Sequence, residues 1–332
     1  MSIRTTTTLA LVSFLALGVT ACSSGENADG GPTDSGHDTG GNTDTGSTTD
    51  TGSMTDTGST TDVQDTSAPT DATDTTTTTD SGGTGTAGDH LLISEIVTQP
   101  ANGEFVEIYN PTSASVDLSN YYLSDNSTYT SIAAGMPWMP ITMNPGTDFL
   151  VQFPPGSSIP AGGVIVIATS PMFPTAWGRC PDFIIAATDL SCAGGGTAHA
   201  MVAPTNGDLG SVPGSMLSND REMVVLFRWS GATTDRLQDV DYVTWGVMFE
   251  DGTRVDKTAV AGYLPDTAPA MQHPAPAAST NGQSIERCTI EPGERLSGGN
   301  GITGHDETSE LLDMSFRVQT MPTPGMRNSC LP

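Results

Sequence analysis

Acidic side chains are the most abundant residues in this chain that could do chemistry. Thirty-eight Asp and Glu stand against eleven Lys and Arg, and the formal net charge is −27 at pH 7. Carboxylates suit hard cations such as Ca²⁺, which takes about six to eight oxygen ligands. Our calcium-site candidates fall in the first predicted strands and their turns: Glu95, Glu104, Glu107, Asp117 and Asp125. The alternative is that the glutamates at 104 and 107 face solvent and that both aspartates cap turns.

A second acidic grouping lies in the Gly-rich segment 297–310, where His305, Asp306 and Glu307 are adjacent. It could hold a cation, although adjacent side chains rarely point to one place. Catalytic motifs such as H-E-x-x-H, G-x-S-x-G and the P-loop do not occur in the sequence, so no catalytic residue is predicted. We expect the four histidines that follow residue 88 to be solvated loop side chains: His90, His199, His273 and His305.

Four cysteines in the later part of the chain predict disulfides: Cys180, Cys192, Cys288 and Cys330. An even number in an oxidising compartment indicates two bonds, for which three pairings exist. Sequence proximity favours Cys180–Cys192, and Cys288–Cys330 would then join the final segment to an earlier strand. The alternatives are four reduced, buried thiols or a zinc site, and the latter lacks the short C-x₂₋₄-C spacing.

The start of the chain has the layout of an export signal. Arg4 precedes a short apolar run from Leu9 to Val19, which is too short for a bilayer about 30 Å thick, and small residues follow. Val19-Thr20-Ala21-Cys22 resembles the lipobox of bacterial lipoproteins, in which the cysteine is lipidated and becomes the new N-terminus. We therefore predict a lipoprotein signal peptide over 1–21 and lipidation of Cys22. The alternative is an ordinary signal peptide.

These features predict a place in the cell envelope, anchored to a membrane through the lipid. Ser23, directly after the predicted lipidation site, favours the outer membrane if enterobacterial sorting rules apply. The domain is then either surface-exposed or periplasmic.

Residues 22–88 predict a disordered acidic tether rich in Thr, Asp, Gly and Ser. A six-residue unit, TDTGST, repeats from Thr43, and twelve acids but no Lys or Arg fall between residues 23 and 88. Such a segment has no apolar surface to offset the entropy of ordering. Because nucleic-acid phosphates select Lys and Arg, nucleic acid is excluded as a partner. Anionic lipid does not attract the chain either, so attachment depends on the lipid anchor.

Short apolar runs separated by Gly and Pro predict an all-β domain over 89–332. The strand candidates are His90–Val97, Glu104–Tyr109, Tyr121–Leu123, Phe149–Phe153, Val164–Ala168, Met223–Trp229, Val240–Trp245 and Ser284–Arg287. In the second of these, alternation places Val106 and Ile108 on one face and Phe105, Glu107 and Tyr109 on the other.

The order of several short motifs resembles the lamin-tail domain. These motifs are Leu92-Ile93-Ser94-Glu95-Ile96, residues 103–111, 116–119, 123–125, 159–163, 239–243 and 282–287, and Pro324-Gly325. The resemblance implies an immunoglobulin-like β-sandwich, here with long loop insertions near 171–217 and 249–281. Bacterial lamin-tail domains occur alone and attached to exported enzymes, so the resemblance also implies a targeting or interaction role without naming a ligand.

Two tryptophans in Pro- and Gly-rich loops, Trp138 and Trp177, are candidate exposed anchors for a sugar or a peptide, whereas Trp229 and Trp245 on predicted strands belong in the core. We predict a non-catalytic binding module on a flexible stalk, with an envelope or extracellular polymer or protein as partner. The alternatives are a metal (calcium)-dependent hydrolase that uses the acidic groupings, and a purely structural envelope protein.

Overall fold

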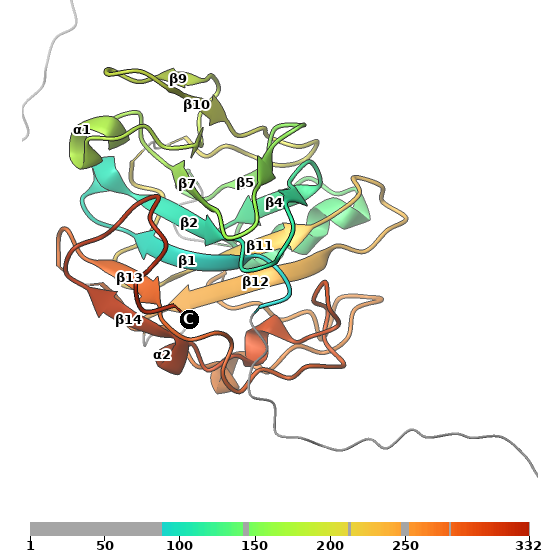
Figure 1. Cartoon of the computed structure of the whole chain (residues 1–332). Coiled ribbons are helices and arrows are strands. Elements are labelled where there is room, and N and C mark those ends of the chain that lie inside the picture. The colour runs from blue at the N-terminus through green and yellow to red at the C-terminus, as the bar shows by residue number, and fades with distance from the viewer. Residues whose placement is uncertain (1–87, 142–145, 212–213, 247–251, 279, 332) are drawn as a thin grey trace, which may run out of the picture. The chain divides into compact units, whose positions relative to one another are not determined.

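Short β-strands are the main regular elements of the residues that the structure describes (Figure 1). The computed structural model describes residues 88–141, 146–211, 214–246, 252–278 and 280–331. The strands are β1 (Leu92–Val97), β2 (Phe105–Tyr109), β3 (Val116–Asp117), β4 (Tyr121–Ser124), β5 (Leu150–Gln152), β6 (Ser158–Ile159), β7 (Val164–Ala168), β8 (Phe183–Ile184), β9 (Leu190–Ser191), β10 (Thr197–Ala200), β11 (Glu222–Arg228), β12 (Gln238–Trp245), β13 (Ser284–Arg287) and β14 (Phe316–Gln319). The helices are α1 (Phe173–Trp177), α2 (Leu312–Ser315) and the 3-10 segments η1 (Ala101–Gly103), η2 (Ser127–Ala134), η3 (Pro269–Met271) and η4 (Glu307–Ser309).

Two sheets form the predicted sandwich. The larger has eight strands in the order β14-β13-β1-β2-β7-β8-β10-β9, and the smaller has four in the order β12-β11-β4-β5. Strands β3 and β6 pair with each other in a small third sheet. Strand β8 runs parallel to both of its neighbours, β7 and β10, whereas the other pairs within the two main sheets are antiparallel. The all-β fold class predicted from the sequence is confirmed.

The main core lies between the two sheets. Strand β2 contributes Val106 and Ile108, and β11 contributes Val224 and Leu226 from the opposite side. Fully burying an aliphatic side chain of this size contributes about 1.5–3 kcal/mol, so the facing rows hold the sheets together. The predicted faces of β2 are confirmed, because Phe105 belongs to a separate apolar cluster on the other side of the sheet.

Each main sheet also carries apolar residues on its outer face. On the larger sheet, the ring of Phe105 packs edge-to-face against Phe173 and Trp177 of α1, with centroids 5.8 and 5.9 Å apart. On the smaller sheet, Tyr129 of η2 packs against Phe227 of β11 at 5.0 Å. The sheets are therefore covered on both sides, and their strands read as nearly continuous apolar runs.

The strand limits predicted from residue patterns agree with the structure to within two residues. For example, β7 and β13 have the predicted bounds, and β2 ends at Tyr109, directly before Asn110 and Pro111. Just before β7, the chain turns at Gly162, whose φ of +67° is one that glycine adopts without strain. Six further strands, β3, β6, β8, β9, β10 and β14, were not predicted.

The two predicted insertions hold part of this added structure. Residues 171–217 contain α1 and the strands β8, β9 and β10. These three strands extend one side of the larger sheet. The described part of 249–281 contains η3 and a long loop. The predicted signal peptide over 1–21, Cys22 and all but the last residue of the tether lie outside the described residues.

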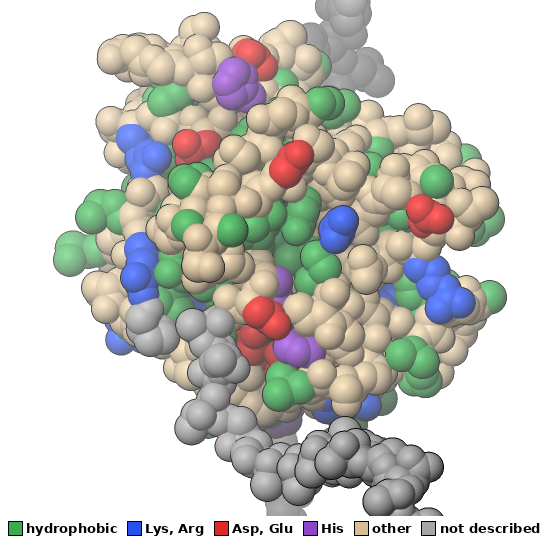
Figure 2. Space-filling model, turned by 45° about the vertical axis from the view of Figure 1, so that its right-hand side comes forward, with side chains coloured by type: hydrophobic (Ala, Val, Ile, Leu, Met, Phe, Trp, Pro, Cys, Tyr) green, Lys and Arg blue, Asp and Glu red, His purple; other side chains and the backbone are tan. Residues whose placement is uncertain are grey.

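Charge is sparse on the visible face of this domain (Figure 2). Isolated Arg and acidic side chains are separated by uncharged polar and apolar ones, and acidic and histidine side chains adjoin near the top and near the centre of the view. Within the described residues, we find no helix with the length and apolar character needed to cross a bilayer.

Candidate functional site

The outer face of the larger sheet carries two facing carboxylates. Glu95 of β1 lies opposite Glu107 of β2, and both are fully buried. The final segment, residues 320–331, runs over β1 (Figure 1), where the N–H groups of Thr323 and Gly325 donate to Glu95 and Glu107 respectively. Burial raises the pKa of Glu95 to about 7 and, together with the charge of its neighbour, raises the pKa of Glu107 to about 8. These carboxyl groups fasten the C-terminal segment.

The two aspartates of the predicted calcium set lie apart from this pair. Asp117 is exposed and accepts hydrogen bonds from the amide and hydroxyl of Ser119, so it caps a turn as expected. Asp125 is fully buried and accepts the N–H of Phe149 at 2.7 Å. Asp125 therefore joins two distant segments, and the turn-capping alternative is wrong for it.

The remaining candidate, Glu104, forms part of the wall of a cavity at one end of the sandwich. One of its oxygens accepts the hydroxyl of Thr169 at 3.1 Å and the N–H groups of Met216 and Leu217 at 2.9 and 3.3 Å. Burial raises its pKa to about 7. The solvent-facing alternative for Glu104 and Glu107 is wrong, because both are buried. Of the five calcium candidates, only the pair on β1 and β2 are neighbours, and calcium binding by the set stays a prediction.

The cavity measures about 660 Å³ and is lined mainly by loops that adjoin strands of both sheets. Its wall includes Thr98–Ala101 after β1, residues 215–222 leading into β11, and Gly252 and Thr253 beyond β12. Ser215 and Asn219 are exposed on this wall. Most of the lining residues carry hydrogen-bonding side chains, so the cavity suits a polar ligand better than an apolar one.

The exposure that we expected of Trp138 is wrong, because its side chain is 8% exposed and lies in the apolar cluster outside the smaller sheet. Trp177 is half-buried, and its indole N–H donates to the carbonyl of Gly103 at 2.8 Å. Both rings therefore pack against the domain, and their binding role stays a prediction. Trp229 and Trp245 are buried, as predicted.

Two disulfides link the cysteines in the favoured pairing. Cys180 joins Cys192 across a Cα–Cα distance of 5.7 Å, and Cys288 joins Cys330 across 4.9 Å. The second bond ties the C-terminal segment to the residue after β13, next to the carboxylates described above. The alternatives of reduced thiols or zinc ligation do not apply to this structure, since the four sulfurs are bonded in two pairs.

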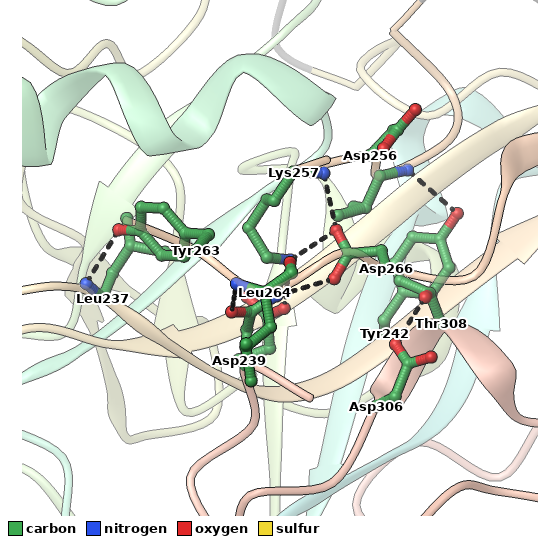
Figure 3. A network of polar contacts seen from close by, with 12 residues as sticks. Leu237, Asp239, Tyr242, Asp256, Lys257, Tyr263, Leu264, Asp266, Asp306 and Thr308 are labelled. Carbon is green, nitrogen blue, oxygen red and sulfur yellow. Dashed lines mark hydrogen bonds and ion pairs between the residues drawn. The ribbon is translucent and has the colours of Figure 1, made fainter. Parts of the chain in front are cut away.

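A buried ionic network fixes the loop after β12 (Figure 3). Lys257, the only lysine in the chain, lies 2.5 Å from Asp239 and 3.0 Å from Asp266, and it donates to the hydroxyl of Tyr129 at 3.1 Å. Burial alone lowers the pKa of this lysine, but the two carboxylates outweigh burial and raise it. All of the ammonium's neighbours come from the fold itself, so the network is structural.

Two histidines and three glutamates meet beside the start of β1. His90 precedes that strand, whereas Glu291, Glu294, His305 and Glu307 follow β13. Ligand atoms of the first histidine and of the glutamates at 291 and 307 lie within 4.8 Å of one another, and the same holds for the other histidine with the glutamates at 294 and 307. Burial raises the pKa of Glu294 to about 9, with the charge of Glu291 adding to the rise.

The sequence identified only part of this cluster. His305 and Glu307 belong to the predicted Gly-rich grouping, but Asp306 turns away and pairs with Arg295. The expected solvation of His90 is wrong, because it is 5% exposed, whereas the other two histidines of the described region, at 199 and 273, are exposed as predicted. A Glu-x-x-Glu spacing over 291–294 was the signal that sequence reasoning missed.

The sandwich, its loops and its end cavity define an immunoglobulin-like domain of the interaction type. Residues 84–246 match the family model described as Lamin Tail Domain. This family is not a known catalytic one. The matched region ends with β12, so β13, β14 and the C-terminal segment complete the larger sheet beyond it.

Among solved structures, the domain is similar to a DUF4876 family protein from Bacteroides thetaiotaomicron. The two share 16% sequence identity with a TM-score of 0.40, over 73% of this chain and 74% of that one. A search of curated proteins finds no match.

Proposed function

We propose that this protein is an exported lipoprotein whose lamin tail domain binds a polar ligand in the cavity at the end of the sandwich. The observation that carries the proposal is the cavity of about 660 Å³, whose walls come from loops of both sheets. Loops on a rigid scaffold are where binding residues concentrate. The ligand belongs to an envelope or extracellular polymer or protein, because hydrogen-bonding walls match hydroxyl-, amide- or peptide-rich chains.

Export and anchoring rest on the sequence and on the disulfides. The lipobox-like residues before Cys22 indicate lipidation, and two disulfides suit an oxidising compartment. The acidic segment that follows would hold the domain away from the membrane, either at the cell surface or in the periplasm.

We propose a non-catalytic role for the domain. Glu104 is the buried carboxyl group of the cavity wall, and it accepts hydrogen bonds from Thr169, Met216 and Leu217. A general base needs an oxygen within hydrogen-bond reach of the substrate proton. Through one oxygen, this carboxylate is a brace that holds Met216 and Leu217 next to the start of β2.

Filling the cavity tests the binding role. The probes are arrays of envelope oligosaccharides and peptides, applied to the full chain and to Ser215→Trp and Asn219→Trp, which place an indole in the opening. We expect at least a tenfold loss of binding in both variants and no loss in Ser113→Trp, a control on an exposed turn elsewhere. Equal binding by all three variants would place the ligand elsewhere, and no binding by the unaltered chain would favour the purely structural role.

Metabolic labelling tests the anchor. Cells fed radioactive palmitate should label the unaltered chain, whereas Cys22→Ala should abolish the label and release the protein from the membrane fraction. Cys288→Ala is the matched control, because it removes a cysteine of the disulfide framework and should keep the label. Label retained in Cys22→Ala would contradict the proposed lipidation site.

A further inference from the structure

The cluster beside β1 contains carboxylates that the protein itself leaves without partners. The side chain of Glu294 is 1% exposed and that of Glu307 is 2% exposed. Both oxygens of the first and one oxygen of the second accept no hydrogen bond. Leaving such buried acceptors unsatisfied is costly, and costlier still when they are charged. A bound cation would relieve this cost and complete the site.

The arrangement of the ring and carboxylate atoms points to one common centre. The Nε2 of His90 and an oxygen of Glu291 are 2.7 Å apart, yet they are not aligned for a hydrogen bond. Likewise, the Nδ1 of His305 lies 3.3 Å from Glu294 without forming a hydrogen bond. Donor atoms that are close together but not aimed at each other are expected of ligands that surround a shared ion.

Asp89 orients one of the rings for that purpose. Its carboxylate lies 2.8 Å from the Nδ1 of His90. Since a carboxylate can only accept, Nδ1 carries the proton, and in the neutral ring the lone pair of Nε2 would face the glutamates. This carboxylate–histidine arrangement recurs behind metal-binding histidines, where it fixes the ring and strengthens the ligand.

The arginine side chains near the cluster form ion pairs with other residues. Arg287 donates to Asp241, Glu310 and the carbonyl of Ile93, and Arg295 pairs with Asp306. Within the described residues, no Lys or Arg forms an ion pair with the three glutamates of the cluster. With neutral imidazoles and all three glutamates ionised on binding, the ligand set would carry three negative charges, of which a divalent cation would leave only one.

We propose that His90, Glu291, Glu294, His305 and Glu307 bind one divalent transition-metal ion, with Zn²⁺ as the expected metal. Two imidazoles with carboxylates favour zinc over Ca²⁺ or Mg²⁺, which prefer oxygen ligands alone. The ion would join the residue at which the ordered domain begins to the loop after β13. Its role is structural, because it would clamp the junction with the acidic segment to the C-terminal part of the domain.

Metal titration of the full chain, purified with both disulfides formed, tests this proposal. After removal of metals with EDTA, calorimetry with Zn²⁺ alone should show one equivalent bound per chain, and added Co²⁺ should give the visible absorption of a nitrogen- and oxygen-bound ion. Millimolar Ca²⁺ should not displace either metal. A folded chain that binds less than a tenth of an equivalent and gives no Co²⁺ spectrum would overturn the proposal.

Variants locate the site. Glu294→Gln and Glu307→Gln should each weaken Zn²⁺ binding at least tenfold, and Asp89→Asn, at an exposed residue, should weaken it about 10–100-fold through the orientation of His90. The controls are His199→Gln and His273→Gln, each of which removes an exposed histidine near an exposed aspartate. Loss of binding in the controls, or unchanged binding in all three cluster variants, would reject the assignment.

Discussion

Arg287 connects the two sheets through a fully buried guanidinium. It contacts Asp241 on β12 at 3.0 Å, Glu310 at 2.5 Å and the carbonyl of Ile93 on β1 at 3.0 Å. Removing one partner of a buried ion pair leaves the remaining charges uncompensated, at a cost of about 3–5 kcal/mol. We therefore expect Arg287→Leu to lower the free energy of unfolding by that amount in urea titrations.

The matched control is Arg228→Leu, at the exposed last residue of β11. Surface substitutions of this kind change stability by less than about 0.5 kcal/mol. Equal effects of the two substitutions would mean that the buried pairs contribute nothing beyond a surface arginine.

Glu107 should make the stability of the protein depend on pH. Its pKa is about 8 in the folded state and about 4.3 when unfolded, so the folded state holds the proton more tightly. Its contribution to stability is complete below the unfolded pKa and is lost as the pH rises through the folded value. Each unit of pKa is worth about 1.4 kcal/mol. Glu107→Gln should thus match the unaltered chain at pH 4 and exceed its stability by a few kcal/mol at pH 9.

Thermal unfolding across this pH range measures the effect, with Asp313→Asn at an exposed site as the control. Parallel stability curves for the Glu107→Gln variant and the unaltered chain would contradict the raised pKa of this carboxyl group.

The burial of this carboxyl group also marks a limit of sequence reasoning. Alternation along β2 correctly assigned Glu107 to the face opposite Val106, but a period of two says nothing about what covers that face. The cover comes from Gly325, more than two hundred residues later, whose N–H donates to the carboxylate at 2.7 Å. The burial of His90 was missed for the same reason, because the glutamates around it follow β13.

At the scale of elements, the two disulfides should differ in their contribution to stability. Cys288–Cys330 closes a separation of 42 residues and Cys180–Cys192 one of 12. Loop-closure entropy assigns these bonds about 4 and about 3 kcal/mol respectively. We expect the double serine variant of the first pair to lose more stability in urea than that of the second.

Hydrogen exchange gives this prediction a structural readout. Without its disulfide, the segment 320–331 should exchange faster, and so should the parts of β1 and β2 beneath it, because the segment then loses its covalent link and keeps non-covalent contacts such as the hydrogen bonds to Glu95 and Glu107 and the stacking of Arg327 on Tyr109. Faster exchange limited to residues 180–192 in both variants would contradict the proposed role of the segment.

All strands of five or more residues were predicted, whereas none of the two-residue strands was. Strands such as β2, β7 and β11 carry consecutive β-branched or alternating apolar residues that separate them from their Gly- and Pro-rich surroundings. Strands β3, β6, β8 and β9 have only two residues each, too few for any period to appear. The 3-10 segment η2 has few apolar residues at helical spacing. Its place over the smaller sheet depends on the packing of Tyr129 and Ile132 in the apolar cluster there.

At the scale of the molecule, the features that distinguish this chain gather around the two ends of the ordered domain. His90 at its start faces glutamates that follow β13, and the final segment returns over β1 to a disulfide with Cys288. The lamin tail match stops at residue 246, so these fastenings come mainly from residues after it. On the proposed tether, the domain would be loaded where the predicted stalk joins it, next to the cluster that contains His90.

Protease treatment of intact cells tests this organisation. Residues 23–88 contain no Lys or Arg, so trypsin has no site there, whereas proteinase K should cut this predicted tether before the packed domain. We expect mass spectrometry to find the domain from about residue 88 onward released by proteinase K and its tether uncut by trypsin. Release from intact cells would place the domain at the cell surface, and release only after the outer membrane is opened would place it in the periplasm. Cleavage within the sandwich before the tether would contradict the division between an unfolded stalk and a fastened domain.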